Sequence, residues 1–158
     1  MRVRAAGPED AGLILELVRE LAAFEREPDA VAATAEDFRR ELASAHPAFG
    51  CLIAELDGRP AGFALFFHNF STWTGRRGIY LEDLFVRDSA RGRGVGRRLI
   101  VELARLAVER GCARLDLWVL QWNPARRFYE DLGYHWKEDW LHYRLDGKAL
   151  AALAASDS

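Results

Sequence analysis

A run of alternating glycines between a strand-like segment and a helical one restricts the fold more than any other feature of this chain. Residues 91–96 read RGRGVG; they follow the apolar segment Ile79–Val86 and lead into the amphipathic segment Val95–Glu109. Glycines let a backbone approach a ligand closely and turn consecutive N–H groups outward. The N-terminus of the following helix adds unpaired donors and the positive end of its dipole, so the turn suits a diphosphate. The candidate contacts are Arg91, Gly92, Arg93, Gly94, Val95 and Gly96.

The spacing of these glycines narrows the kind of phosphate ligand. The pattern is G-x-G-x-G, because Arg97 stands where a dinucleotide-binding G-x-G-x-x-G run has its last glycine. No G-K-[S/T] follows, which excludes a P-loop. Arg97 and Arg98 add positive charge at the start of the helix, which favours an anionic ligand. A glycine-rich turn beside a solvated basic helix end is the alternative that these residues leave open.

The hydrophobic periods along the chain predict a mixture of helices and strands. Asp57-Gly58 predicts a tight hairpin, and Ser71–Gly78 a loop. This order predicts an α/β fold, a central twisted mixed β-sheet flanked by helices on both faces, in one domain over residues 1–158. Helices are expected from Pro8 through Phe24, from Thr34 to about Ala43, over Val95–Glu109 and over Pro124–Leu132. Strands are expected at Val3–Ala5, Gly50–Leu56, Ala61–His68, Ile79–Val86 and Leu115–Leu120, with closing strands at Tyr134–Trp136 and Leu141–Leu145.

Charge and composition exclude several classes of partner. The 158 residues carry a formal net charge of −2, which favours neither nucleic acid nor an anionic membrane surface. The longest apolar runs, Ala61–Phe67 and Ala149–Ala155, are far shorter than the roughly 20 residues that a membrane-spanning helix needs. Cys51 and Cys112 form no C-x-x-C pair and have no histidine at metal-ligand spacing. We therefore expect a protein of the reducing cytoplasm without a metal.

Two motifs, in order, resemble the GNAT acetyltransferase superfamily. The first is R-x-x-G-x-G over residues 91–96, after a strand that ends at Val86. The second begins at Asn123 and continues as Tyr129-x-x-x-Gly133 before an aromatic residue. Three further stretches are similar to the diamine (spermidine/spermine) and thialysine acetyltransferase branch, namely Glu20–Glu25, Tyr80–Val86 and Gln121–Asn123.

That resemblance implies an acetyl-CoA-dependent N-acetyltransferase, with a polyamine or a lysine-like diamine as the first candidates for the acceptor. The primary amine of the small molecule would attack the thioester directly. The resemblance also implies a homodimer. It assigns main-chain groups of Leu84, Phe85 and Val86 to the acetyl and pantetheine portion of the cosubstrate, and it adds Asn123 as a further contact.

Acetyl transfer to an amine needs a base and an acid. An alkyl amine has a pKa of about 10.4, so a base must remove its proton at neutral pH. Glu82 is the candidate base by the family resemblance, with Asp83 or a water chain as alternatives; its neighbours Leu81 and Leu84 are expected to desolvate it and raise its pKa. Tyr129 is the candidate acid, because a phenol stays protonated at pH 7 and can donate to the departing thiolate.

The acceptor side is expected to be acidic and aromatic. Carboxylates attract a polycation, and aromatic rings pack against its methylenes or its charge. A solvated charged face is the alternative for Glu25, and a core or interface position the alternative for Trp118. The candidate substrate contacts are Phe24, Glu25, Glu82, Trp118 and Glu138.

The sequence is compatible with three other functions to different degrees. Within the same enzyme class the acceptor could be a protein lysine or an N-terminus. A non-catalytic acyl-CoA-binding sensor would keep the fold, but binding alone does not need the acid Tyr129. A nucleic-acid-binding domain could use the basic run at 91–98, but the net charge of −2 disfavours it.

Overall fold

The structure is a computed structural model that describes residues 1–156. By its internal contacts the chain divides into two compact units, Met1–Leu120 and a second unit that begins at Gln121. The expectation of one domain over the whole chain stays a prediction.

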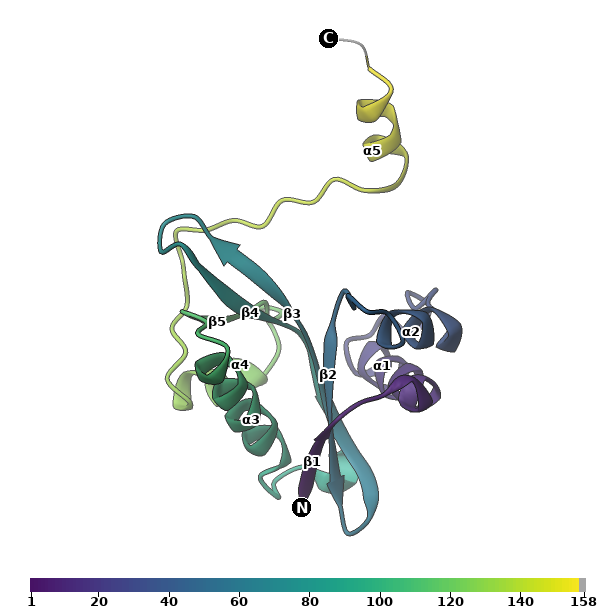
Figure 1. Ribbon diagram of the computed structural model, residues 1–158, viewed down its shortest axis with the longest axis vertical. Coiled ribbons are helices and arrows are strands. Elements are labelled where there is room, and N and C mark those ends of the chain that lie inside the picture. Colours follow the sequence, from purple (N-terminus) through teal and green to yellow (C-terminus); the bar gives the residue numbers. More distant parts are fainter. Residues whose placement is uncertain (157–158) are drawn as a thin grey trace. The chain divides into compact units, whose positions relative to one another are not determined.

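A five-stranded mixed sheet forms the centre of the first unit (Figure 1). Its strands are hydrogen-bonded in chain order, β1-β2-β3-β4-β5. The first four strands are antiparallel neighbours, whereas β5 runs parallel to β4. The strands are β1 (Arg2–Ala5), β2 (Gly50–Leu56), β3 (Arg59–Ser71), β4 (Arg76–Val86) and β5 (Leu115–Leu117).

Helices cover both faces of this sheet. In Figure 1, α1 and α2 lie on one face and α3 on the other. The α/β fold class predicted from the sequence is therefore confirmed. The helical segments of this unit are η1 (Pro8–Asp10), α1 (Ala11–Phe24), α2 (Ala35–Leu42), η2 (Asp88–Ala90) and α3 (Val95–Glu109).

Local sequence signals explain where several elements begin and turn. At the start of α2, Thr34 Oγ1 accepts the Asp37 N–H at 3.3 Å, and the Asp37 carboxylate accepts the Thr34 N–H at 2.9 Å. This reciprocal pair is a capping box. Asp57 and Gly58 both have positive φ, 53° and 75°, which a two-residue type I′ hairpin turn requires. Both predictions are confirmed.

Each face of the sheet has its own buried side chains. The inward face of α1 packs with apolar residues of β2, β3 and β4 in one buried cluster. On the other side, α3 contacts β3 and β4 and buries Val95, Leu99 and Leu103. The α1 cluster contains Ile14, Leu17, Leu21, Cys51, Ile53, Phe63, Leu65 and Phe85.

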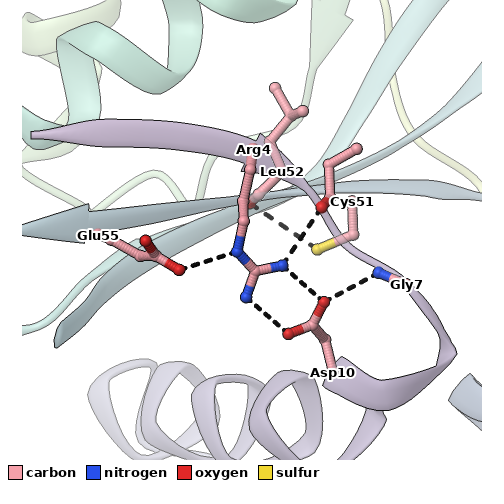
Figure 2. Close-up of polar contacts among 7 residues, drawn as sticks. Arg4, Gly7, Asp10, Cys51, Leu52 and Glu55 are labelled. Atoms are coloured by element: carbon pink, nitrogen blue, oxygen red, sulfur yellow. Dashed lines mark hydrogen bonds and ion pairs between the residues drawn. The ribbon is translucent and has the colours of Figure 1, made fainter. Parts of the chain in front are cut away.

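Arg4 on β1 joins three segments of the first unit (Figure 2). Its guanidinium donates to both carboxylate oxygens of Asp10 in η1, at 2.7 and 2.8 Å, and to Glu55 on β2 at 2.8 Å. The Asp10 carboxylate also accepts the Gly7 N–H at 2.9 Å. The hydrogen bond from Arg4 lowers the pKa of the buried Asp10. The start of α1 is thus tied to the sheet by one arginine.

The structure corrects the sequence prediction at several strand ends. β3 and β4 extend into the segment Ser71–Gly78 that was expected to be a loop, and the turn occupies only residues 72–75. Within it the Gly75 N–H donates to the Ser71 carbonyl at 2.9 Å. The predicted strand Leu115–Leu120 ends at Leu117. Pairing between neighbouring strands overrides the polar composition that signalled a loop.

Over residues 121–156, the described part of the second unit, there are two helices, α4 (Ala125–Asp131) and α5 (Gly147–Ala154). α4 lies within the predicted helix Pro124–Leu132 and is one residue shorter at each end. The sequence did not predict α5. The closing strands expected at Tyr134–Trp136 and Leu141–Leu145 are wrong, since the structure assigns no strand to either. A strand needs a hydrogen-bonding neighbour, and the alternating Leu141 and Tyr143 side chains are 75% and 86% exposed instead.

Candidate active site

The glycine turn leads into α3, as predicted. Gly92 and Gly94 have φ of 72° and 79°, in the left-handed region where a residue with a Cβ is strained. Val95 is buried and anchors the first helical turn, in which the Arg98 N–H donates to the Gly94 carbonyl at 3.0 Å. The N–H groups before it have no acceptor within the helix. An anion at this turn would therefore meet several backbone donors.

The arginines of this turn lie on the surface and form ion pairs within the first unit. Arg91 pairs with Asp88 at 2.8 Å, and Arg93 pairs with Asp57 at 3.0 Å. Exposed ion pairs of this kind contribute about 0–1 kcal/mol. A phosphate could therefore replace the Asp57 carboxylate at Arg93 at little cost in stability.

A β-bulge interrupts β4 at Glu82. Along the pairing with β3, Phe66 is opposite Leu81 and Leu65 is opposite Asp83, so Glu82 is the extra residue. Leu65 and Phe66 are adjacent in β3 and therefore point to opposite faces. Their partners Leu81 and Asp83 do the same. The bulge thus moves Asp83 to the face of the sheet that α1 covers.

Asp83 titrates far from its ordinary range. Its neighbour across the strands, Leu65, belongs to the buried cluster under α1, and Asp83 itself is half-buried. The pKa of Asp83 is raised from 3.8 to about 7, first by burial and then by the negative charges of Glu82 and Glu25. Burial also raises the pKa of Glu25. The three carboxylates are therefore close enough to influence one another.

Glu82 itself is exposed. The expectation that its apolar neighbours desolvate it is wrong, because the bulge leaves Glu82 outside the regular alternation and buries Asp83 instead. The role of Glu82 as the base is a separate matter and stays a prediction.

The edge of β4 beyond the bulge is not paired with β5. The parallel pairing of β4 with β5 runs from Ile79 to Leu81, opposite Leu115 to Leu117, and the described register ends there. Residues 82–86 continue along β3. In a strand, alternate N–H and C=O groups point to each side, so part of the main chain over Leu84, Phe85 and Val86 faces away from β3. Ligands of α/β sheets commonly bind beyond the carboxyl ends of parallel strands.

The acceptor candidates of the first unit lie at the end of α1 and after β5. Phe24 is the last residue of α1, and Glu25 follows it. The Arg91 guanidinium lies over the Phe24 ring, 4.7 Å from its centroid. Trp118 directly follows β5 and is 55% exposed. The structure thus brings Phe24 to the glycine turn and Glu25 near Asp83.

The remaining candidates belong to the second unit. The Asn123 side-chain oxygen accepts the Ala125 N–H at 2.9 Å and so helps to start α4. Tyr129 lies on α4 and makes edge-to-face contacts with Phe128 and Tyr134, with ring centroids 5.2 and 5.6 Å apart. Glu138 is exposed. These contacts are internal to the second unit.

Two features of the site were missed by sequence reasoning. The sequence around Glu82 carries no glycine or other signal for a bulge, so a regular alternation was assumed. The contact of Arg91 with Phe24 joins residues 67 positions apart in the chain. Such a contact has no local signature.

Neither a metal centre nor a membrane span is evident in residues 1–156. No group of three His, Cys, Asp or Glu side chains within that range could hold a metal ion. No helix of the described chain is long and apolar enough to cross a bilayer.

These elements together describe an α/β protein with a glycine turn that offers backbone donors to an anion, a stretch of β4 that is not paired with β5 and a carboxyl group with a pKa of about 7. Comparison with known proteins is more specific. Residues 14–134 match the model of the acetyltransferase (GNAT) family. The chain belongs to this family and is an N-acetyltransferase. The resemblance seen in the sequence is confirmed.

Individual relatives agree with this assignment. The chain is 37% identical to thialysine N-epsilon-acetyltransferase of Mus musculus, over 97% of this chain and 96% of that protein. It is 32% identical to spermidine/spermine N(1)-acetyltransferase-like protein 1 of Homo sapiens, over 97% of this chain but 24% of that longer protein. Among solved structures, an integron cassette protein from the mobile metagenome of V. cholerae superposes with a TM-score of 0.82 at 28% identity, over 98% of both chains.

Proposed function

We propose that this enzyme transfers the acetyl group of acetyl-CoA to a side-chain primary amine of a small lysine-like diamine, with thialysine as the first candidate and polyamines as the second. The observation that carries the proposal is the similarity to thialysine N-epsilon-acetyltransferase along nearly the whole of both chains. The acidic group at the end of α1 and on the β4 bulge is consistent with a cationic acceptor.

Acetyl-CoA as the cosubstrate is supported by the donors that this chain offers. The turn at Gly92 and Gly94 and the N-terminus of α3 suit a diphosphate. The open edge of β4 over Leu84, Phe85 and Val86 suits an extended chain with amide groups, such as pantetheine. When bound, acetyl-CoA supplies a thioester whose carbonyl carbon an amine can attack. Backbone N–H groups fixed in a strand need little reorganisation as charge develops on the carbonyl oxygen.

The amine proton goes to the pair of carboxylates on the bulge. Glu82 is exposed, so an incoming amine can reach it. Asp83, with a pKa of about 7, is partly ionised at neutral pH and can accept a proton there, directly or through Glu82 or a water molecule. The negative charge of Glu82 contributes to the raised pKa of Asp83, so the two side chains act together.

Tyr129 is the proposed acid. A phenol is protonated at pH 7 and can donate its proton to the thiolate that leaves. Its ring is flanked by Phe128 and Tyr134, which restrict its orientation on α4. Asn123 is retained as a proposed cosubstrate contact, and Trp118 and Glu138 as proposed acceptor contacts.

A free-thiol assay with acetyl-CoA and a panel of amines tests the proposal. The panel contains thialysine, lysine, spermidine, putrescine and a lysine-containing peptide. We expect CoA release with at least one small diamine at a higher kcat/KM than with the peptide. The Tyr129→Phe variant should lower kcat without weakening acetyl-CoA binding measured by calorimetry.

Other outcomes of this assay would support a different function. Preference for the peptide would favour a protein or peptide acetyltransferase. Tight acetyl-CoA binding with no thiol release from any amine would favour a non-catalytic sensor. Equal kcat for the wild type and Tyr129→Phe would remove the acid role of Tyr129.

Two further properties belong to the proposal. We place the enzyme in the cytoplasm, which suits its unpaired Cys51 and Cys112. We also propose a homodimer, supported by the exposed aromatic residues of the second unit, such as Trp136 and Tyr143 at 72% and 86% exposure. Light scattering coupled to size-exclusion chromatography would test the dimer, and a mass of one chain at micromolar concentration would contradict it.

A further inference from the structure

The side chain of Arg91 is directed at aromatic rings rather than outward from the glycine turn. Its guanidinium carbon lies 4.7 Å from the centroid of the Phe24 ring and 5.9 Å from that of Phe85. Its Nε donates to the carbonyl of Val86 at 3.1 Å, and its Nη1 pairs with Asp88 at 2.8 Å. One residue of the turn therefore contacts both the end of α1 and the end of β4.

These contacts favour an arginine in particular. A planar guanidinium can lie over an aromatic face while its edge donates to a carbonyl, whereas a lysine ammonium is a point charge. Phe85 is buried and fixed in β4, so it provides a rigid reference. Phe24 is half-buried, packs against the buried cluster under α1 and is the last residue of its helix, and the Arg91 guanidinium lies over its ring.

The end of α1 leads directly to the acidic group. Glu25 follows Phe24, and its N–H donates to the Leu21 carbonyl at 2.9 Å, so its backbone continues the geometry of the helix. The charge of Glu25 raises the pKa of Asp83, so the two carboxyl groups lie near each other. Because Glu25 directly follows Phe24 in the chain, a shift of Phe24 would move Glu25 relative to Asp83.

We propose that Arg91 is a positioning residue for the amine acceptor, which holds Phe24 and Glu25 in place from the cosubstrate turn, rather than a ligand of the diphosphate. This inference rests on the proposed function, because it assigns the acceptor to the end of α1. It predicts that substitution of Arg91 raises the KM of the amine. If Arg91 were a phosphate ligand, the substitution would raise the KM of acetyl-CoA instead.

Steady-state kinetics with two donors separate these roles. Acetyl-CoA carries the diphosphate, and acetyl-pantetheine does not. We expect Arg91→Gln to raise the amine KM about threefold to fivefold with both donors while kcat changes less than twofold, as loss of one exposed cation–π contact allows. A rise confined to the KM of acetyl-CoA, absent with acetyl-pantetheine, would overturn the proposal and make Arg91 a phosphate ligand.

Two comparison variants sharpen the result. Arg91→Lys keeps the charge but not the plane, so it should raise the amine KM in the same direction, whereas a purely electrostatic role would be rescued by lysine. Arg105→Gln removes the same charge from α3 outside the glycine turn, where Arg105 pairs with Glu102 at 2.9 Å. It should leave the amine KM unchanged.

A double-mutant cycle tests whether Arg91 acts through Phe24. Phe24→Leu keeps an apolar side chain but removes the ring. If the contact carries the effect, Arg91→Gln should raise the amine KM less than 1.5-fold in the Phe24→Leu background. Independent, multiplicative effects of the two substitutions would contradict the proposed route.

Hydrogen exchange tests the positioning without any turnover. The amides of Glu25 and Glu27 donate to the carbonyls of Leu21 and Ala22 at 2.9 Å each. Arg91→Gln should speed exchange at both amides, and Arg105→Gln should not. If Arg91→Gln leaves the exchange of these amides unchanged, the positioning role is contradicted even if the enzyme acetylates small amines. If exchange is faster but the enzyme acetylates no small amine, the proposed function is contradicted and the positioning role stands.

Discussion

Leu81 and Asp83 lie on opposite faces of the sheet, although they are two residues apart on one strand. A regular strand would place them on the same face. The bulge at Glu82 is the reason, because it inserts one residue between the partners of Phe66 and Leu65. As a result Leu81 is buried in the core, and a carboxylate lies under α1, where burial raises its pKa to about 7.

Asp83 should destabilise the fold at neutral pH. Its pKa is 3.8 when unperturbed and about 7 in the folded protein, so between these values the unfolded chain releases its proton first. Its contribution to the free energy of unfolding therefore falls as the pH rises from about 4 to 7. Asp83→Asn should remove this slope and stabilise the protein by up to about 4 kcal/mol at pH 8, as measured by urea denaturation.

The control for this prediction is the exposed Asp29, for which Asp29→Asn should change the stability by less than about 0.5 kcal/mol at any pH. Wild type and Asp83→Asn should converge below pH 4. A constant difference between them from pH 4 to 8 would contradict the raised pKa.

The same pair of carboxylates should shape the pH–rate profile. We expect kcat/KM of the wild type to rise with pH with an apparent midpoint near 7, and Asp83→Asn to lose this limb. Glu82→Gln removes a charge that raises the pKa of Asp83, so in this variant the limb should move to lower pH. A limb that keeps its midpoint in both variants would exclude the pair as the base.

Gly94 should be required for cosubstrate binding because of its backbone conformation. Its φ of 79° costs a non-glycine residue about 1–2 kcal/mol. Gly94→Ala should therefore reshape the turn and weaken CoA binding about tenfold by calorimetry. In Gly12→Ala, the new Cβ meets nothing within 4 Å on α1, so this control should bind CoA normally and be slightly more stable. Equal CoA affinity for Gly94→Ala and wild type would contradict the role of the turn.

Arg4 should contribute more to stability than other arginines in ion pairs. Its partner Asp10 has a side chain only 8% exposed, so Arg4→Met leaves a buried carboxylate without its cation at a cost of about 3 kcal/mol. The pair Arg40–Asp37 is exposed, and Arg40→Met should cost less than about 1 kcal/mol in the same denaturant titration.

The difference in stability between wild type and Arg4→Met should depend on pH, because the pKa of Asp10 is lowered in the folded protein. Its stabilisation is present above about pH 4 and is lost as the pH falls through the lowered pKa of the folded state. The gap between wild type and Arg4→Met should narrow in that range. A gap that stays constant as the pH falls through this range would show that Arg4 acts through packing instead.

Local signals predicted the elements whose ends are set by single residues. The bounds of α3 agree with the prediction because Gly94 and Gly111, with φ of 79° and 66°, mark its two ends. The capping box of Thr34 and the turn at Asp57-Gly58 were found for the same reason. In each case one or two residues determine the backbone.

Features that depend on distant neighbours could not be predicted. A bulge is set by the register of two strands, and nothing in the residues around Glu82 marks it. The alternating pattern of Leu141–Leu145 indicated a strand, but a strand forms only against a partner. The contact of Arg91 with Phe24 likewise arises only when α1 and β4 come together.

Following the labelled acetyl carbon is a direct test of acetyl transfer to a small amine. Acetyl-CoA labelled with ¹³C at the acetyl carbonyl would be mixed with the enzyme and thialysine, and NMR would follow the labelled carbon. The proposed function predicts that the signal moves from the thioester to an amide of the side-chain nitrogen, at a rate that falls in Tyr129→Phe. A label that stays on the thioester, or appears only as free acetate, with thialysine and every other small amine would contradict it.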